Sequence, residues 1–199
     1  MAITDQRGGS TVDDIHVSAD LESIIVTEEQ ILARLAEMAA DIERDYQGRD
    51  LVLVGVLGGA AMMAVDLARS LTRHVELGWM AVRSYGAGVT SSGSVRMLKD
   101  LDMEVAGRDV LIVDTVVDTG LTIQWLAPQI AQRGPASVHV ATLFRKPTAP
   151  ATSNLLRYVG YEIGEGMLVG YGLDYAGRYR NLRCCAVLAP HVYARPALR

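Results

Sequence analysis

Two runs of consecutive apolar residues, at 51–57 and 110–113, constrain the fold of this chain more than any other feature. The first run is Leu-Val-Leu-Val-Gly-Val-Leu, with no alternation of apolar and polar residues. A strand with one solvated face alternates, whereas a strand covered on both faces does not, so both runs indicate buried strands of a parallel sheet. Helical patterns follow at 60–71 and at 122–133, and Gly134 ends the second helix. The alternation of strand and helix predicts an α/β fold with a mostly parallel sheet.

Local signals predict further elements around this core. Thr27 and Gln30 form a capping box, because each side chain can bond the backbone N–H of the other, and this predicts a helix over 28–45. Additional strands are predicted at 75–82, 137–144, near Tyr158, at 168–172 and at 186–188.

The length suits one compact domain, since the chain has 199 residues and 50% of them are hydrophobic. Gly8, Gly9 and Ser10 interrupt any pattern near the start, so we expect residues 1–20 to form a flexible N-terminal arm and 21–199 a single domain. The stretch 84–100 is rich in glycine and serine, which predicts a long mobile loop with a functional role.

Charge and hydropathy exclude several classes of partner. The formal net charge of −4 offers no basic surface for nucleic acid. No apolar run approaches the roughly 20 residues of a membrane-spanning helix, and the N-terminus lacks the apolar core of a signal peptide. We therefore expect a cytoplasmic protein that binds neither nucleic acid nor membrane. The adjacent Cys184 and Cys185 suit neither a disulfide nor a metal pair and are expected to be buried.

The segment 110–122 is the strongest indication of ligand binding. It reads VLIVDTVVDTGLT, so an apolar strand reaches the carboxyl edge of the sheet and a tight turn then leads into a helix. Ligands bind at this edge in open α/β sheets. The N–H groups of Thr119, Gly120, Leu121 and Thr122 can point outward together, and the helix N-terminus adds partial positive charge. We predict a phosphate-binding loop over 114–122.

Two other interpretations apply to Asp118-Thr119-Gly120. The same tripeptide marks the catalytic loop of aspartic proteases, but these are all-β proteins, and here a helical pattern follows. The motif can also be an ordinary strand-to-helix turn in which Asp118 caps the helix or is solvated. The loop alone leaves this second alternative open.

Several ordered motifs between Leu51 and Tyr193 resemble type I phosphoribosyltransferases, most closely their hypoxanthine-guanine branch. The segment 110–122 resembles the family's signature for phosphoribosyl diphosphate (PRPP), and 54–59 resembles its first loop. Further similarity lies in the lid motifs 84–86 and 91–93, in 99–102, and in the C-terminal motifs 169–175 and 179–182. The resemblance implies the type I phosphoribosyltransferase fold, an α/β fold whose mostly parallel central sheet is flanked by helices and carries a small hood.

The resemblance also implies an activity. Enzymes of this family transfer the 5-phosphoribosyl group from PRPP to a purine or purine-like base, release pyrophosphate and form a nucleoside 5'-monophosphate, with magnesium as cofactor. The protein would then serve purine salvage or specialised nucleoside metabolism. A homodimer or homotetramer is implied in the same way.

Matching positions receive roles by the same resemblance. Asp118 corresponds to the catalytic acid/base near the purine N7, and the lid would exclude water from the reaction centre. The 5'-phosphate would bind to Asp118, Thr119, Gly120, Leu121 and Thr122, and the ribose to Asp114 and Thr115. The pyrophosphate would bind to Gly58, Gly59 and Arg180, and Asp174 would be the magnesium ligand. The base would contact Lys146, Met167 and Leu168, and the lid would include Ser84 and Tyr85. A surface charge remains an alternative for Arg180, and a loop-end lysine for Lys146. A non-proline cis peptide bond is expected between Gly58 and Gly59.

Three positions depart from the family pattern. Asp114-Thr115 replaces the usual Glu-Asp pair, so one charge is lost at the ribose. Met167 replaces the aromatic residue that usually stacks on the purine, and methionine packs more loosely. Gly58 stands where lysine is usual. These departures leave open an altered heterocycle as substrate, and also a non-catalytic regulator that binds PRPP or a nucleotide on the same fold.

Overall fold

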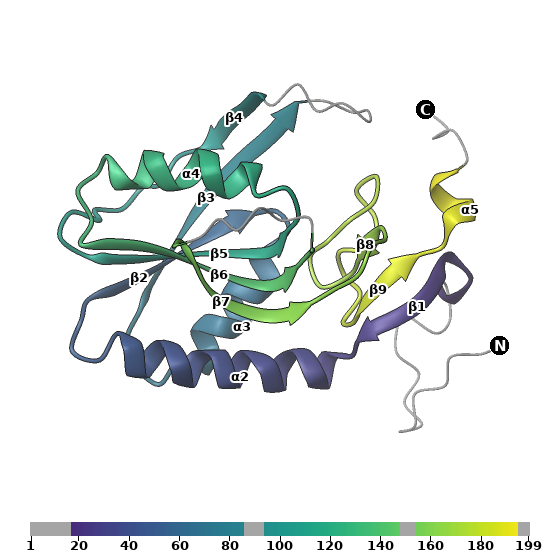
Figure 1. Cartoon of the computed structure of the whole chain (residues 1–199), viewed down its shortest axis with the longest axis horizontal. Coiled ribbons are helices and arrows are strands. Elements are labelled where there is room, and N and C mark those ends of the chain that lie inside the picture. The colour runs from purple at the N-terminus through teal and green to yellow at the C-terminus, as the bar shows by residue number, and fades with distance from the viewer. Residues whose placement is uncertain (1–16, 86–93, 148–153, 195–199) are drawn as a thin grey trace. The chain divides into compact units, whose positions relative to one another are not determined.

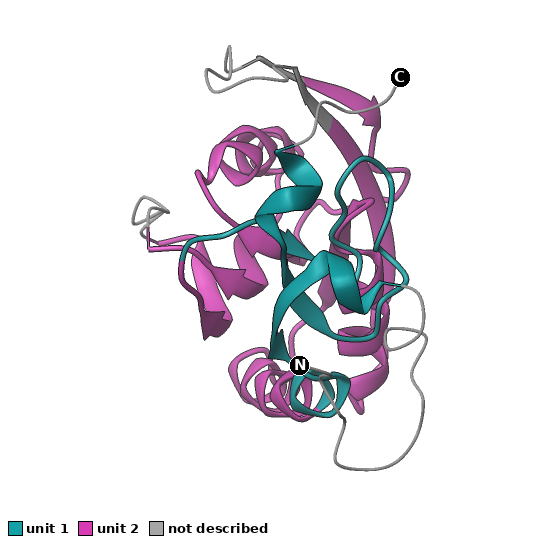
Figure 2. Cartoon of the chain, turned by 90° about the vertical axis from the view of Figure 1, so that its right-hand side faces the viewer, with its two compact units in different colours: residues 1–32, 165–199 teal, residues 33–164 magenta. Residues whose placement is uncertain are grey.

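The computed structural model describes residues 17–85, 94–147 and 154–194 (Figure 1). They divide into two units (Figure 2), which we call the sheet unit (residues 33–164) and the terminal unit (residues 1–32 and 165–199).

The sheet unit contains a six-stranded sheet in the order β4-β3-β2-β5-β6-β7. Its strands are β2 (Leu51–Leu57), β3 (Glu76–Tyr85), β4 (Ser94–Lys99), β5 (Asp109–Val117), β6 (Ser137–Arg145) and β7 (Leu156–Glu162). All neighbouring pairs are parallel except β3 and β4. The α/β prediction with a mostly parallel sheet is therefore confirmed.

Helices cover both faces of this sheet. Helix α4 (Leu121–Ala131) lies on one face, and α2 (Glu28–Asp45) and α3 (Ala61–Ser70) lie on the other (Figure 1). Strands β2 and β5 are buried from both sides, as their apolar runs predict. Gly55 is required within β2, because a Cβ atom there would lie 2.4 Å from the ring of Trp79.

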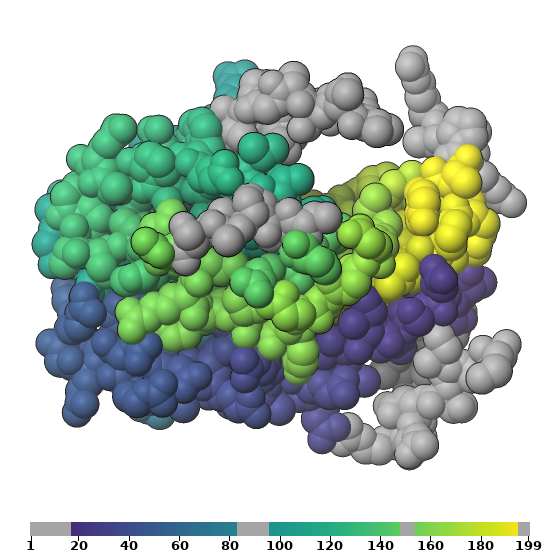
Figure 3. Space-filling model, viewed as in Figure 1, coloured from purple at the N-terminus to yellow at the C-terminus, as the bar shows by residue number. Residues whose placement is uncertain are grey.

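One long helix is fastened to the edge of the sheet. Arg34 of α2 donates hydrogen bonds to the carbonyl oxygens of Val159 and Gly160 in β7, at 3.0 and 2.9 Å. The residues of α2 and β7 accordingly pack side by side on the face seen in Figure 3. None of the helices among the described residues is long and apolar enough to cross a bilayer.

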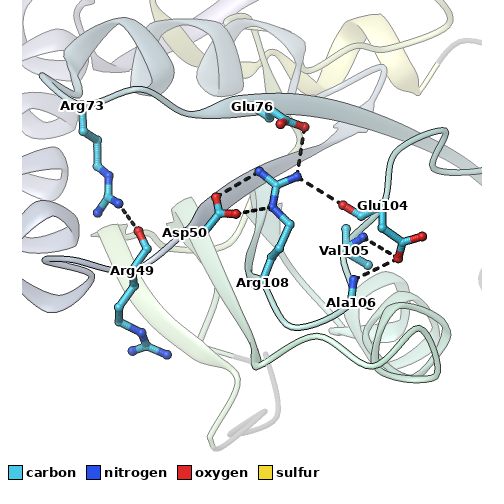
Figure 4. Close-up of polar contacts among 8 residues, drawn as sticks. All are labelled: Arg49, Asp50, Arg73, Glu76, Glu104, Val105, Ala106 and Arg108. Atoms are coloured by element: carbon cyan, nitrogen blue, oxygen red, sulfur yellow. Dashed lines mark hydrogen bonds and ion pairs between the residues drawn. The ribbon is translucent and has the colours of Figure 1, made fainter.

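A charged cluster, which we call the Arg108 cluster, joins chain segments at the amino ends of three strands (Figure 4). Arg108, just before β5, pairs through two nitrogens with Asp50, just before β2, at 2.8 and 3.0 Å. It also contacts Glu76 at the start of β3 and the carbonyl oxygen of Glu104, at 3.0 and 3.2 Å. These bonds hold the turns at the end of the sheet opposite to the predicted phosphate-binding loop.

The terminal unit contains a small antiparallel sheet in the order β1-β9-β8. Its elements are the 3-10 helix η1 (Ser18–Asp20), β1 (Leu21–Val26), β8 (Leu168–Val169), β9 (Cys185–Leu188) and α5 (Pro190–Tyr193). Cys184 and Cys185 are buried, as predicted. Of the predicted flexible arm, residues 1–16 lie outside the described part of the chain, and Ser18–Asp20 form the 3-10 turn.

The secondary-structure predictions need correction around the predicted loops. The predicted loop 84–100 is wrong at both ends, because β3 continues to Tyr85 and β4 begins at Ser94 and pairs antiparallel with it. Its composition favours a loop, but antiparallel pairing between the two ends of the stretch decides their conformation. Similarly, β5 continues through Val117, so residues 114–117 belong to a strand, and the turn before α4 is only 118–120.

Candidate functional site

The turn between β5 and α4 has the geometry expected of a phosphate-binding loop. Gly120 precedes the helix with a φ of 71°, a left-handed conformation that glycine adopts without steric cost. Its carbonyl accepts the N–H of Gln124 at 2.9 Å, and Thr119 Oγ1 accepts the N–H of Leu121 at 3.5 Å. Gly120 makes no side-chain cap, so the helix N-terminus can receive an external anion.

Asp118 and Lys146, predicted as catalytic residue and base-binding residue, are brought together. Lys146 Nζ lies 2.9 Å from Asp118 Oδ2, with 15% of the lysine side chain and 48% of the aspartate side chain exposed. The backbone N–H of Lys146 also donates to the carbonyl oxygen of Val117 at 3.0 Å. Lys146 is thus held at the end of β5 by two contacts, which a solvated loop-end lysine would not need.

Asp114 lies near the carboxyl end of β5, in a partly buried position. Burial raises the pKa of its carboxyl group to about 7, although the N–H groups of Thr115 and Val116 act in the opposite direction. A group with this pKa is partly protonated at neutral pH. It therefore differs from an ordinary exposed aspartate.

Thr115 is fully buried, in contrast to Asp114. Its Oγ1 donates a hydrogen bond to the carbonyl oxygen of Gly59 at 3.0 Å. The structure thus connects two predicted sets of site residues, those of the ribose and those of the pyrophosphate.

Gly58 and Gly59 form the turn between β2 and α3, where Gly58 is exposed and Gly59 is partly buried. A cis peptide bond is present, but it joins Leu57 and Gly58 rather than Gly58 and Gly59. The predicted position was wrong by one residue. Both peptide bonds precede a glycine in the same turn, so the sequence does not distinguish between them.

Ser84 and Tyr85 are the last residues of β3, and their partners in β4 are Val95 and Ser94. The remaining residues of the predicted lid, 86–93, lie outside the described part of the chain. The structure therefore describes the two strands from which this segment extends.

The remaining predicted site residues belong to the terminal unit. Asp174 and Arg180 form an ion pair at 2.6 Å, and Asp174 Oδ2 also accepts the N–H of Gly177 at 2.8 Å. Arg180 donates to the carbonyl oxygen of Gly172 at 2.6 Å, so it is a structural part of this loop and not only a surface charge. Of the two residues predicted to contact the base, Met167 is exposed and Leu168 is buried.

One anchor of this loop was not anticipated. The hydroxyl of Tyr179, the neighbour of Arg180, donates to Asp20 Oδ2 at 2.8 Å. Tyr179 has a φ of 72°, which is unusual for a residue with a side chain. No local sequence signal indicates this contact, because its two partners are 159 residues apart.

A mostly parallel sheet with a strand, a short turn and a helix N-terminus at its carboxyl edge defines an α/β protein of the class that binds its ligands at this edge. Residues 23–176 match the phosphoribosyl transferase domain family. The chain belongs to the type I phosphoribosyltransferase family, within its hypoxanthine-guanine branch.

Three relatives illustrate the similarity. The chain is 47% identical over 180 residues to hypoxanthine-guanine phosphoribosyltransferase from Mycobacterium bovis, covering 87% of this chain and 89% of the relative. The crystal structure of a hypoxanthine phosphoribosyltransferase from Staphylococcus aureus is similar with a TM-score of 0.84 and 37% identity, over 90% of this chain and 97% of that one. The chain is also similar to a solved structure of the hypoxanthine phosphoribosyl transferase from Trypanosoma cruzi, with a TM-score of 0.80 and 40% identity over 87% of this chain and 94% of that one. That structure addresses the role of the C-terminal region in the oligomeric state and enzymatic activity of the Trypanosoma cruzi protein.

Proposed function

We propose that this protein transfers the 5-phosphoribosyl group of PRPP to a 6-oxopurine base such as hypoxanthine or guanine, releasing pyrophosphate and forming the nucleoside 5'-monophosphate. The observation that carries the proposal is the pairing of Asp118 with Lys146 beside the helix N-terminus of α4. The pair combines a carboxylate able to exchange a proton with an ammonium group able to donate to an oxygen.

We assign the following roles to the residues around this pair, in line with the family resemblance. The 5'-phosphate occupies the turn of Asp118, Thr119 and Gly120 and the first N–H groups of α4. Lys146 donates to the 6-oxo group of the base, and Asp118 holds or releases the proton at N7. Asp114 accepts hydrogen bonds from the ribose hydroxyls. The protein accelerates the reaction by positioning its two substrates and by stabilising the charge that develops on the ribose.

Magnesium enters this proposal as a companion of the diphosphate. Among the described residues, no group of three or more His, Cys, Asp or Glu side chains gathers as a metal site. Asp174 offers a single carboxylate, and magnesium is typically bound by one or two carboxylates together with substrate phosphates and water. The donor set therefore fits a metal that arrives with PRPP, where it would neutralise the charge of the leaving pyrophosphate, with Arg180 beside it.

The finer details of substrate and assembly are part of the proposal. Met167 is 41% exposed, so an unbranched thioether is available to pack against the base in place of an aromatic ring. We propose that the substitution of a flexible thioether for an aromatic ring lets the protein accept guanine, xanthine or an altered heterocycle. We also propose that the protein acts in the cytoplasm as a homodimer or homotetramer. An oligomeric state has been addressed for the similar Trypanosoma cruzi protein, which supports this proposal.

The test is pyrophosphate release with PRPP, magnesium and a panel of hypoxanthine, guanine, xanthine, adenine and deazapurines. Asp118→Asn should lower kcat by about 10²- to 10⁴-fold, the usual contribution of a general acid or base, while PRPP still binds. Asp41→Asn is a matched control, because Asp41 is also 48% exposed and pairs with a cation, Arg44, at 2.8 Å. Unchanged turnover in Asp118→Asn would remove this residue from the mechanism.

The same assay separates the enzyme from a regulator. Wild-type protein that binds PRPP but releases no pyrophosphate with any base would support the non-catalytic alternative. Release with one base of the panel would identify the substrate and exclude the non-catalytic alternative.

A further inference from the structure

Thr115 stands at a position where the family usually has an acidic residue, and its surroundings differ from those of a ribose ligand. Because β5 continues through Val117, Asp114 and Thr115 are adjacent strand residues whose side chains point to opposite faces. Asp114 keeps some exposure, whereas Thr115 has 0%. The two side chains therefore have different environments and need not share one ligand.

The hydroxyl of Thr115 is occupied by another part of the protein. Oγ1 donates to the carbonyl oxygen of Gly59 at 3.0 Å, connecting residues 56 positions apart. An ionised aspartate only accepts hydrogen bonds and would place a negative charge against this carbonyl oxygen, whereas threonine can donate. The contact is thus specific to the hydroxyl side chain of this chain.

The centre of the turn that receives this hydrogen bond consists of two glycines, Gly58 and Gly59. On the side toward α3 the turn is fixed by Ala60. The N–H of Ala60 donates to the carbonyl oxygen of Val56 at 3.2 Å, and its carbonyl oxygen accepts the N–H of Ala64, the first bond of helix α3, at 2.8 Å. Gly58 and Gly59 have no side chains to pack, and glycine has the largest backbone freedom of all residues. The bond from Thr115 restrains the Gly59 carbonyl and, with it, the peptide planes on both sides.

We propose that Thr115 is a positioning residue that holds the Gly58–Gly59 turn in the orientation that binds pyrophosphate. The inference rests on the proposed function, because it assigns the turn to the diphosphate of PRPP. Loss of the donor would leave a partly buried carbonyl unsatisfied and free the turn to move. Binding of the diphosphate should then weaken, although Thr115 itself touches no substrate.

The test uses two probes that separate the ends of PRPP: magnesium pyrophosphate, which has no ribose, and ribose 5-phosphate, which has no diphosphate. Calorimetric titration of Thr115→Val, which keeps the shape and removes the hydroxyl, should show about tenfold weaker pyrophosphate binding, the usual effect of an unsatisfied polar group. Ribose 5-phosphate binding should change less than about twofold. Thr115→Ser should restore pyrophosphate binding.

Thr142→Val is the matched control for a merely structural effect. Thr142 is also fully buried and donates at 3.0 Å to a carbonyl oxygen, that of Phe144, but within its own strand β6. It should lower the melting temperature as much as Thr115→Val without weakening pyrophosphate binding.

Each result decides the matter. Equal pyrophosphate binding by Thr115→Val and wild type overturns the positioning role, and selective loss of ribose 5-phosphate binding assigns Thr115 to the ribose instead. If wild-type protein binds neither probe and transfers no phosphoribosyl group, the proposed function itself fails.

Discussion

Asp114, which we propose as a ribose-binding residue, also affects the stability of the protein. Its carboxyl group is largely shielded from solvent near the end of a buried strand, and this burial raises its pKa to about 7. The ionised form is the better acceptor for two ribose hydroxyls, because an ionised carboxylate offers only acceptors. In the ligand-free protein this charged form is disfavoured.

The raised pKa predicts a pH-dependent effect of Asp114→Asn on stability. An unfolded aspartate has a pKa near 3.9, so between about pH 4 and pH 7 the folded protein holds a proton that the unfolded chain has released. Wild-type stability should therefore fall as pH rises through this window. Asp114→Asn lacks this term, and its free energy of unfolding should exceed that of wild type by up to about 4 kcal/mol at pH 8, with little gain at pH 4.5.

Urea unfolding of the ligand-free protein at pH 4.5, 6 and 8 measures this difference. Asp41→Asn, on the exposed face of α2, should show no comparable change between these pH values. A gain of the same size at pH 4.5 and pH 8 for Asp114→Asn would contradict the assignment.

Local sequence signals predict whole elements where the deciding interactions are local. Helix α2 begins and ends where its pattern predicts, since Thr27 and Gln30 form the capping box, with bonds of 2.9 and 3.3 Å. Strand β2 also matches its predicted bounds, because a continuous apolar run between turn residues suits only a buried strand.

Elements that depend on distant partners could not be predicted in this way. Strand β1 pairs with β9, more than 150 residues away along the chain. A second source of error is composition, because β4 pairs with the preceding strand β3 although the sequence between 84 and 100 is typical of a loop. The site shows the same division. A turn before the helix could be predicted from the sequence alone, although it begins at Asp118 and not at Asp114 as predicted, whereas the contact of Thr115 with Gly59 could not be predicted.

The Arg108 cluster yields a prediction about the elements it joins. Arg108 is only 18% exposed and holds the amino ends of β2, β3 and β5 together through Asp50 and Glu76. Arg108→Met should lower the free energy of unfolding by about 1–2 kcal/mol, because charged hydrogen-bond partners lose their donor. Turnover should remain unchanged, since the nine residues of β5 separate the cluster from Asp118 by roughly 30 Å.

Denaturant unfolding and steady-state kinetics of the same preparation test this expectation. Arg44→Met is the control, because Arg44 is 70% exposed and pairs with Asp41 on the surface of α2, where a loss within about 0.5 kcal/mol is expected. Loss of turnover in Arg108→Met without loss of stability would show that the cluster acts on the site.

At the scale of the whole molecule, a second titrating group opposes Asp114. His139 of β6 shares a hydrogen bond of 2.8 Å with the buried Tyr46 hydroxyl, and Arg157, Arg49, Asp109 and Asp45 lie around it. Burial and then the two arginines lower the pKa of His139. The folded protein therefore binds fewer protons here than the unfolded chain, and stability is lost as pH falls below about 6.5.

These two groups predict opposite slopes in one stability profile. From pH 5 to about 6.5, His139 makes wild-type stability rise and Asp114 makes it fall, so the sum is flatter than either contribution. In Asp114→Asn the free energy of unfolding should rise with pH over this range, because only His139 still contributes. In His139→Gln, whose amide can still bond Tyr46, the free energy of unfolding should fall with pH. Asp114 and His139 lie on neighbouring strands, and different polar groups shift their pKa values, so the double variant should equal the sum of the single changes within about 0.5 kcal/mol. Denaturant unfolding at pH 5, 6, 7 and 8 measures these free energies, and His74→Gln at an exposed position is the control. If the pH dependence of a single variant equals that of wild type, the substituted group does not contribute to the pH dependence of stability.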